Sequence, residues 1–299
     1  MLRAGCCTAP FLAALALLLS LLEVRAESRV ALVIGNAAYQ NTAALANPEN
    51  DAEDTAAALR RVGFNVHFER NLTKRGMERA LAAFARVARD ADAALFYYAG
   101  HGMQYHGLNY LMPIDAKLED EFSLNFEMTR LDDVLTSLGR SRSIRILILD
   151  ACRRNPLVER LAGMATTRDF VPARGLARID AARGMVIAYS TQADQFAEDG
   201  TGLRNSPFTA SLVKQIDEPG LEIGTMFRRV ATEVNRATGG RQFPELSISL
   251  LGEFFFNPAD TDTQAWSKVR GSRDPGQLRN FLQRYSPRQL LAKIRQYLP

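Results

Sequence analysis

The sequence predicts an α/β fold, a sandwich of helices around a mostly parallel central sheet. Short apolar runs alternate along the chain with segments whose apolar residues recur at helical spacing, an order typical of this class. The composition is that of a globular protein, since 47% of the 299 residues are apolar and 23% are charged. The three cysteines are too few for a scaffold built on disulfides.

The alternation starts with a strand, a helix and a second strand. Residues 29–35 form a short apolar run that ends in glycine, as a buried strand does. Asn47 and Pro48 fit the N-cap and the first residue of a helix, which Gly63 ends. Residues 64–68 then alternate apolar and polar side chains, which predicts a strand with one exposed face.

A second helix, a third strand and a hairpin follow. Thr73 fits the N-cap of a helix that reaches residue 87. Residues 93–98 are the next apolar strand, and the polar and aromatic stretch up to Asp115 predicts a small hairpin. A short helix is expected over residues 129–138.

The second half of the chain continues the same pattern. Residues 143–149 and 184–190 are apolar runs that predict two further strands. Two helices are expected near residues 206–216 and 223–236, and residues 246–250 predict a last strand or extended segment.

Two segments depart from the alternation. Residues 153–183 have little periodicity and are expected to form a long loop, which inside a compact domain is usually functional. From residue 258 the composition changes, and the apolar residues fit a pair of helices. We therefore divide the chain into a main domain, residues 27–257, and a helical appendage, residues 258–299, which must pack on the domain or on a partner.

The first 26 residues have the three parts of a secretory signal peptide. Arg3 is the positive charge, residues 11–22 are the apolar part, and residues 24–26 place short side chains before a cleavage point. An uncleaved N-terminal anchor is the alternative. Cleavage would leave Cys152 as the one cysteine of an exported protein, periplasmic or secreted, with no membrane-spanning segment.

The net charge of +4 is unevenly distributed and does not indicate nucleic-acid binding. Residues 153–183 carry seven arginines and three acidic residues, and residues 258–299 carry eight basic and three acidic residues. The rest of the main domain is acidic. Because basic and aromatic residues are not interleaved and no nucleic-acid motif occurs, we expect no nucleic-acid partner.

The chemistry is expected at the carboxyl edge of the sheet, where open parallel sheets bind their ligands. His101 follows the third strand between two glycines, and Cys152 follows the fourth strand 51 residues later. A thiol reacts as a thiolate, and a nearby imidazole can take its proton. Taken alone, a cysteine after an apolar strand is more often buried and inert, and a histidine between two glycines is often only a turn residue. Their shared position at strand ends favours a catalytic pair.

The backbone around the pair supplies further candidates. The N–H groups of Gly102 and Cys152 are candidate oxyanion donors. The other two histidines are less suited to catalysis, because His67 lies within an alternating strand and His106 lies in the predicted hairpin.

The motifs around these residues resemble those of caspase-like cysteine peptidases, the clan of caspases, metacaspases and paracaspases. The sequence DACRR at residues 150–154 resembles the caspase signature Q-A-C-[RQG]-G, and YYAGHG at residues 97–102 lies upstream at the spacing of the family's histidine. The similarity covers residues 29–257 and is greatest to bacterial members and to paracaspases, in which an aspartate takes the place of the glutamine. It implies a caspase-like three-layer sandwich, with His101 as general base and Cys152 as nucleophile.

The resemblance also implies the substrate class. Caspases select aspartate with arginines in the specificity pocket, whereas this chain has Asp150 two residues before the nucleophile. Asp51 matches an acidic pocket residue of metacaspases and paracaspases, and Asp194 is a third candidate. Carboxylates around a small pocket pair with a guanidinium, so we expect cleavage after Arg, with Lys weaker. The alternative for Asp51 is an acid favoured by the helix dipole.

The loop at residues 153–183 corresponds to the linker that is cut when caspases are activated. An arginine-specific enzyme could cut it at Arg168, Arg174 or Arg178, which lie far enough from Cys152 to reach the site. The alternative is a solvated basic loop that stays intact.

We expect neither a cofactor nor an obligatory metal. Metacaspases often require calcium, whereas paracaspases generally do not. Glu119, Asp120 and Glu121 form an acidic group, but they lack the ordered ligand spacing of a calcium site.

Two other functions fit the same motifs. One is a non-catalytic caspase-like module that binds peptides or partners, and the other is a cysteine amidase acting on cell-wall peptides. The sequence leaves open whether the protein is a monomer or a dimer. A protein partner is expected at the C-terminal helices.

Overall fold

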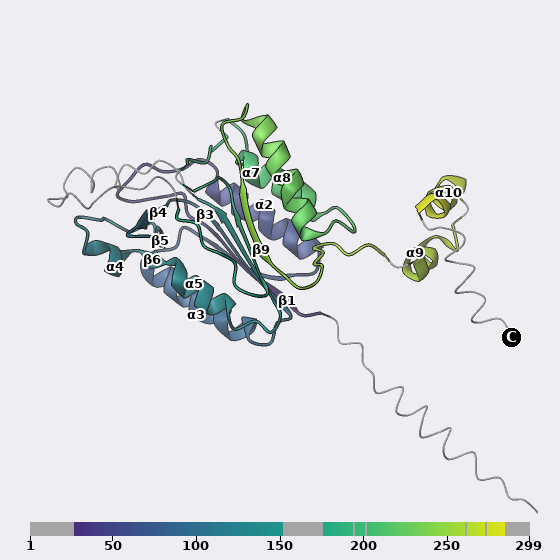
Figure 1. Ribbon diagram of the computed structural model, residues 1–299, viewed down its shortest axis with the longest axis horizontal. Coiled ribbons are helices and arrows are strands. Elements are labelled where there is room, and N and C mark those ends of the chain that lie inside the picture. The colour runs from purple at the N-terminus through teal and green to yellow at the C-terminus, as the bar shows by residue number, and fades with distance from the viewer. Residues whose placement is uncertain are drawn as a thin grey trace, which may run out of the picture.

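The computed structural model describes residues 27–151, 176–193, 195–200, 202–260, 262–272 and 274–284 (Figure 1). Four of the predicted site residues lie outside the described residues: Cys152, Arg168, Arg174 and Asp194. The predicted signal peptide lies outside them as well.

A six-stranded sheet forms the middle layer of the molecule, in the order β2-β1-β3-β7-β8-β9. Its strands are β1 (Arg29–Gly35), β2 (Asn65–Arg70), β3 (Ala93–Ala99), β7 (Ile144–Asp150), β8 (Met185–Tyr189) and β9 (Glu245–Ser249). All neighbours pair in parallel except β8 and β9, which are antiparallel. The expected mostly parallel sheet is therefore confirmed.

Helices cover both faces of this sheet (Figure 1). One face carries α2 (Pro48–Arg61), α7 (Pro207–Ile216) and α8 (Ile223–Ala237), and the other carries α3 (Lys74–Ala88) and α5 (Leu131–Leu138). Each predicted helix in this layer arrangement is present, and the three-layer α/β sandwich is confirmed.

The central strand β3 shows why its sequence is apolar throughout. Every residue of β3 is buried. Leu95 and Tyr97 belong to the core under α2, α7 and α8, whereas Phe96 and Tyr98 belong to the core under α3 and α5. A strand covered on both faces has no solvent side, so the alternation seen in an edge strand is lost. Full burial of one such apolar side chain contributes about 1.5–3 kcal/mol.

A small antiparallel sheet follows β3 directly. It consists of β4 (Gly102–Tyr105), β5 (Leu108–Leu111) and β6 (Thr129–Arg130). The first two strands confirm the predicted hairpin. The helix expected over residues 129–138 was placed two residues too early, because Thr129 and Arg130 pair with β5 and the helix begins at Leu131. The five-residue helix α4 (Ser123–Glu127) was not predicted, since it is too short to show helical periodicity.

Arg29 joins the start of the main body to its end. Its guanidinium donates to the carbonyl oxygens of Phe255 and Phe256 at 3.1 and 2.8 Å. The same group lies over the rings of Phe64 and Phe254, with its carbon 5.8 and 5.1 Å from the centroids. The first strand is therefore held to the last residues of the sandwich by charge-assisted bonds and by cation–π contacts.

Two short helices follow the sandwich, α9 (Asp262–Val269) and α10 (Pro275–Arg284). The rings of Trp266 and Phe281 pack against each other with centroids 5.4 Å apart. Figure 1 shows this pair away from the three layers. Among the described helices, none has the length and apolar character needed to cross a bilayer.

We predict that Gly35 is required for the contact between the end of β1 and the start of α2. A Cβ at this position would overlap the Pro48 carbonyl oxygen and lie 2.8 Å from the Ala52 Cβ. Gly35→Ala should therefore lower the free energy of unfolding by about 1–3 kcal/mol in urea denaturation. The control is Gly252→Ala, whose Cβ meets nothing within 4 Å. Equal stability of the two variants would contradict this close contact.

Candidate active site

The carboxyl ends of β3 and β7 lie side by side. Ala99 and Asp150 are partners in the parallel register, and the N–H of Gly100 donates to the Asp150 carbonyl oxygen at 3.3 Å. His101 is therefore found just beyond β3, next to the end of β7, which Ala151 follows. The predicted partner of His101 is Cys152, the residue after Ala151. It lies outside the described residues, and the pairing stays a prediction.

Two tyrosines fix the backbone of His101. Its N–H donates to the Tyr39 hydroxyl at 2.7 Å, and its carbonyl oxygen accepts from the Tyr98 hydroxyl at 2.9 Å. The Tyr39 and imidazole rings also pack together, with centroids 4.7 Å apart. Nε2 of the imidazole lies 3.4 Å from the Ala43 carbonyl oxygen. Since His101 is only 1% exposed, these contacts set the direction of its ring before any substrate binds.

The glycines on either side of His101 leave the space for this packing. A Cβ at Gly100 would lie 2.6 Å from the hydroxyl oxygens of both tyrosines. A Cβ at Gly102 would lie 3.3 Å from the Ala151 Cβ and 3.2 Å from the Leu176 Cδ2. Gly102, a predicted oxyanion donor, is therefore packed against the residue that precedes Cys152.

Ser190 holds the peptide group that leads into Cys152. Its hydroxyl donates to the Ala151 carbonyl oxygen at 3.1 Å, and its N–H donates to the Leu149 carbonyl oxygen at 2.9 Å. Gln242 in turn donates to the Ser190 carbonyl oxygen at 2.7 Å. The end of β8 thus orients the end of β7.

The structure brings together two of the three predicted pocket acids. Asp51 lies in the first turn of α2, Asp150 is the last residue of β7, and both are 0% exposed. Ser206 bonds to both, because its N–H donates to Asp51 Oδ1 at 2.9 Å and its hydroxyl donates to Asp150 Oδ2. The third acid, Asp194, lies outside the described residues.

Ser206 is also the N-cap of α7. Its hydroxyl oxygen accepts from the N–H of Thr209 at 3.0 Å, and the Thr209 hydroxyl donates to Asp150 Oδ2 at 2.8 Å. The N-terminus of a helix favours nearby negative charge. The start of α7 therefore supplies directed donors and a favourable dipole to a pair of buried carboxylates.

Tyr97 completes this network from within the sheet. Its hydroxyl lies 2.6 Å from the Thr209 hydroxyl. Because Thr209 uses its proton toward Asp150, the phenol is the donor in this pair. Burial raises the pKa of Tyr97 well above its ordinary value, and the charges of Asp150 and Asp51 raise it further. The phenol therefore stays neutral at physiological pH.

The remaining residues considered from the sequence lie elsewhere. His67 is exposed on the edge strand β2, and His106 is exposed in the turn between β4 and β5. Asp120 accepts from the backbone and hydroxyl of Ser123, and Glu121 accepts from the Tyr105 hydroxyl. In the part of the chain that the structure describes, no group of three or more His, Cys, Asp or Glu side chains is arranged to hold a metal ion.

The sequence prediction missed five residues that orient the site: Tyr39, Tyr98, Ser190, Ser206 and Thr209. Ser206 was identified only as the start of a helix, Tyr98 only as part of the sequence YYAGHG, and Ser190 only as the end of a predicted strand. Their roles depend on which strand ends meet which helix, and that is a tertiary property. The local signal that could have identified Ser206 is a hydroxyl residue directly before a helix, which is favoured as an N-cap.

We predict that Ser206→Ala is more destabilising than removal of an ordinary helix cap. Thr73→Ala is the matched control, because Thr73 caps α3 with one bond to the N–H of Gly76. The control should lower the free energy of unfolding by about 1 kcal/mol. Ser206→Ala also deprives buried Asp150 of a donor and should cost about 2–4 kcal/mol. Equal losses in urea denaturation would contradict a bridging role for Ser206.

Comparison with known proteins identifies the family of the chain. A family model described as Caspase domain matches residues 28–255. The human mucosa-associated lymphoid tissue lymphoma translocation protein 1 is 26% identical over 233 residues, which are 75% of this chain and 26% of that protein. Its mouse homologue is 27% identical over the same length. This chain therefore spans about a quarter of the length of these curated relatives.

Solved structures show the same fold. Caspase-1 from Spodoptera frugiperda has a TM-score of 0.57 at 18% identity, covering 79% of this chain and 94% of that one. The protein GSU0716 from Geobacter sulfurreducens has a TM-score of 0.54 at 16% identity, covering 78% of this chain and all of that one. The family model spans most of the chain, and the fold agrees with it. The chain therefore belongs to the caspase domain family and carries a cysteine-type peptidase domain.

Proposed function

We propose that the protein is a cysteine endopeptidase that cleaves after arginine and, less well, after lysine. The observation that carries this proposal is the convergence of Asp51 and Asp150 on Ser206. Two carboxylates in a site of low dielectric attract a guanidinium more strongly than they would in water. A planar guanidinium can also bind carboxylate oxygens in pairs. A pocket for aspartate would need cations in the place of these acids.

The catalytic step uses Cys152 and His101. The imidazole takes the thiol proton, and the thiolate attacks the carbonyl carbon of the scissile peptide bond. The N–H groups of Gly102 and Cys152 stabilise the resulting oxyanion. The C–N bond then breaks, the imidazolium gives its proton to the leaving amine, and water hydrolyses the thioester.

The surroundings of the imidazole support its role as the base. The Ala43 carbonyl oxygen, 3.4 Å from Nε2, favours a proton on that nitrogen. Nδ1 is then the nitrogen that exchanges a proton with the thiol. The fixed backbone of His101 reduces the reorganisation that proton transfer requires.

A panel of fluorogenic peptides that differ in the residue before the scissile bond tests the proposal. We expect turnover with Arg, slower turnover with Lys and none with Asp. Cys152→Ala should abolish turnover. Asp150→Asn should reduce kcat/KM for the arginyl peptide by about 10- to 100-fold, the range for loss of a charged hydrogen bond. Faster cleavage after Asp than after Arg would contradict the proposal, as would activity confined to cell-wall amides.

We further propose self-cleavage in the 153–183 loop, and the structure near Arg178 bears on the site. Leu176 is 1% exposed and packs against Gly102. The backbone N–H and carbonyl oxygen of Ala177 both bond to the Asn109 side chain, each at 2.7 Å. To be cut after Arg178, the chain must give up these contacts and enter the active site as an extended strand. Cleavage at Arg178 therefore has a local unfolding cost.

We predict that self-cleavage occurs at Arg168 or Arg174 rather than at Arg178. Mass spectrometry of the purified wild type and of Cys152→Ala identifies the cut sites. Asn109→Ala releases the Ala177 backbone and should raise the share of cuts after Arg178. Identical fragments in wild type and Cys152→Ala would rule out self-processing, and wild-type cleavage mainly after Arg178 would contradict the anchoring argument.

We also propose that the protein is exported and that residues 1–26 are removed. The support is the charge, the apolar run and the short residues of this segment. N-terminal sequencing of protein recovered outside the cytoplasm should begin at Glu27. A full-length chain in the membrane fraction would instead support the uncleaved anchor.

A further inference from the structure

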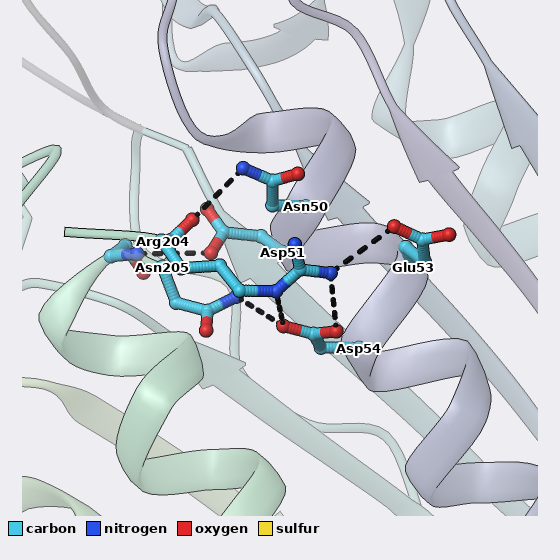
Figure 2. A network of polar contacts seen from close by, with 7 residues as sticks. Asn50, Asp51, Glu53, Asp54, Arg204 and Asn205 are labelled. Atoms are coloured by element: carbon cyan, nitrogen blue, oxygen red, sulfur yellow. Dashed lines mark hydrogen bonds and ion pairs between the residues drawn. The ribbon is translucent and has the colours of Figure 1, made fainter.

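The segment that leads from β8 into α7 is tied to α2 by a polar network (Figure 2). Arg204 donates through Nε and one terminal nitrogen to the two oxygens of Asp54, at 2.8 and 2.9 Å. The same terminal nitrogen lies 3.2 Å from Glu53 Oε2. The Asn205 amide donates to Asp54 at 3.0 Å, and the Asn50 amide donates to the Arg204 carbonyl oxygen at 3.2 Å.

This network ends at the two buried carboxylates. Ser206 follows Arg204 by two residues and bonds to both Asp51 and Asp150. Because two residues span less than about 8 Å, Ser206 must move when Arg204 moves along α2. In Figure 2 the Arg204 guanidinium reaches along the side of α2 toward Asp54 and Glu53, while Asp51 faces the same segment of chain.

We propose that Arg204 is a positioning residue for the arginine pocket, holding Ser206 at the place where it can bond to both Asp51 and Asp150. This inference rests on the arginine specificity proposed above. In that role Arg204 acts through the chain that joins it to Ser206.

The chemistry of the pair suits this role better than a role in stability. The Arg204 side chain is 56% exposed, and exposed ion pairs contribute little to stability. A two-pronged guanidinium–carboxylate bond does fix geometry, however. The hydrogen bond from Arg204 is the main cause that lowers the pKa of Asp54, and the carboxylate is therefore charged near neutral pH.

We call the Arg204–Asp54 ion pair the latch, and the chain contains a matched control for it. Arg61, the last residue of α2, bonds to Asp217 through Nε and a terminal nitrogen at 3.1 and 2.6 Å, and its side chain is 52% exposed. This pair joins α2 to the residue that follows α7, at the opposite end of that helix. Arg61→Gln therefore removes the same kind of bond between the same two regions without touching the Ser206 end.

The experiment compares Arg204→Gln with Arg61→Gln by two readouts. The first is amide hydrogen exchange in peptides covering residues 202–210. Arg204→Gln should speed exchange there, and Arg61→Gln should not. The second is the ratio of kcat/KM for arginyl and lysyl peptides. Arg204→Gln should lower this ratio about tenfold, chiefly through KM for the arginyl peptide. The reason is that a guanidinium needs both carboxylates in place to bind them in pairs, whereas an ammonium does not. Arg204→Lys keeps the positive charge but cannot bond to both oxygens of Asp54 in the same way. Its arginyl/lysyl ratio should lie between those of the wild type and Arg204→Gln.

A double variant tests the route of the effect. Asp54→Asn should have the same effect on the arginyl/lysyl ratio as Arg204→Gln, and the two together should be no worse than either alone. Unchanged exchange in Arg204→Gln would overturn the inference whatever the activity. An unchanged ratio in an enzyme that prefers arginine would overturn it as well. A wild type without arginine preference would instead refute the proposed function, and the exchange result would still decide whether the latch holds Ser206.

Discussion

The parallel pairing of β3 with β7 is the constraint on which the site depends. It sets Ala99 beside Asp150, and so the residues after both strands emerge at one edge of the sheet. The pairing holds because both strands are buried on two faces, where an unpaired backbone would be costly. Ala99 and Asp150, which are 51 positions apart in the chain, thereby become neighbours at this edge.

Asp51 and Asp150 are fully buried acids, and burying them is costly. An isolated carboxylate removed from water is strongly destabilising unless donors replace the lost hydration. Ser206 and Thr209 supply such donors, and the N-terminus of α7 adds a favourable dipole. One hydroxyl residue thus both starts a helix and links two acids that come from different elements. The arginine pocket that we propose depends on this preorganised pair of acids.

The order of strands and helices could be predicted from the sequence because each element carries a strong local pattern. The apolar runs at 29–35 and 93–98, for example, became β1 and β3 with nearly the same bounds. The placement of His101 at a strand end followed from that order. Short elements were less predictable: α4 has five residues, and β6 has two that are defined only by their pairing with β5. The roles of Tyr39 and Ser206 depend on contacts between distant elements, which no local pattern reveals.

Covalent labelling with an arginyl chloromethyl ketone tests the central claim most directly, because it requires the nucleophile, the base and the pocket at once. Mass spectrometry of the labelled protein gives both the modified residue and the rate. We expect alkylation of Cys152 in the wild type and none after His101→Ala or Asp150→Ala. Labelling of Asp150→Ala at the wild-type rate, or faster labelling of the wild type by an aspartyl reagent, would contradict the account.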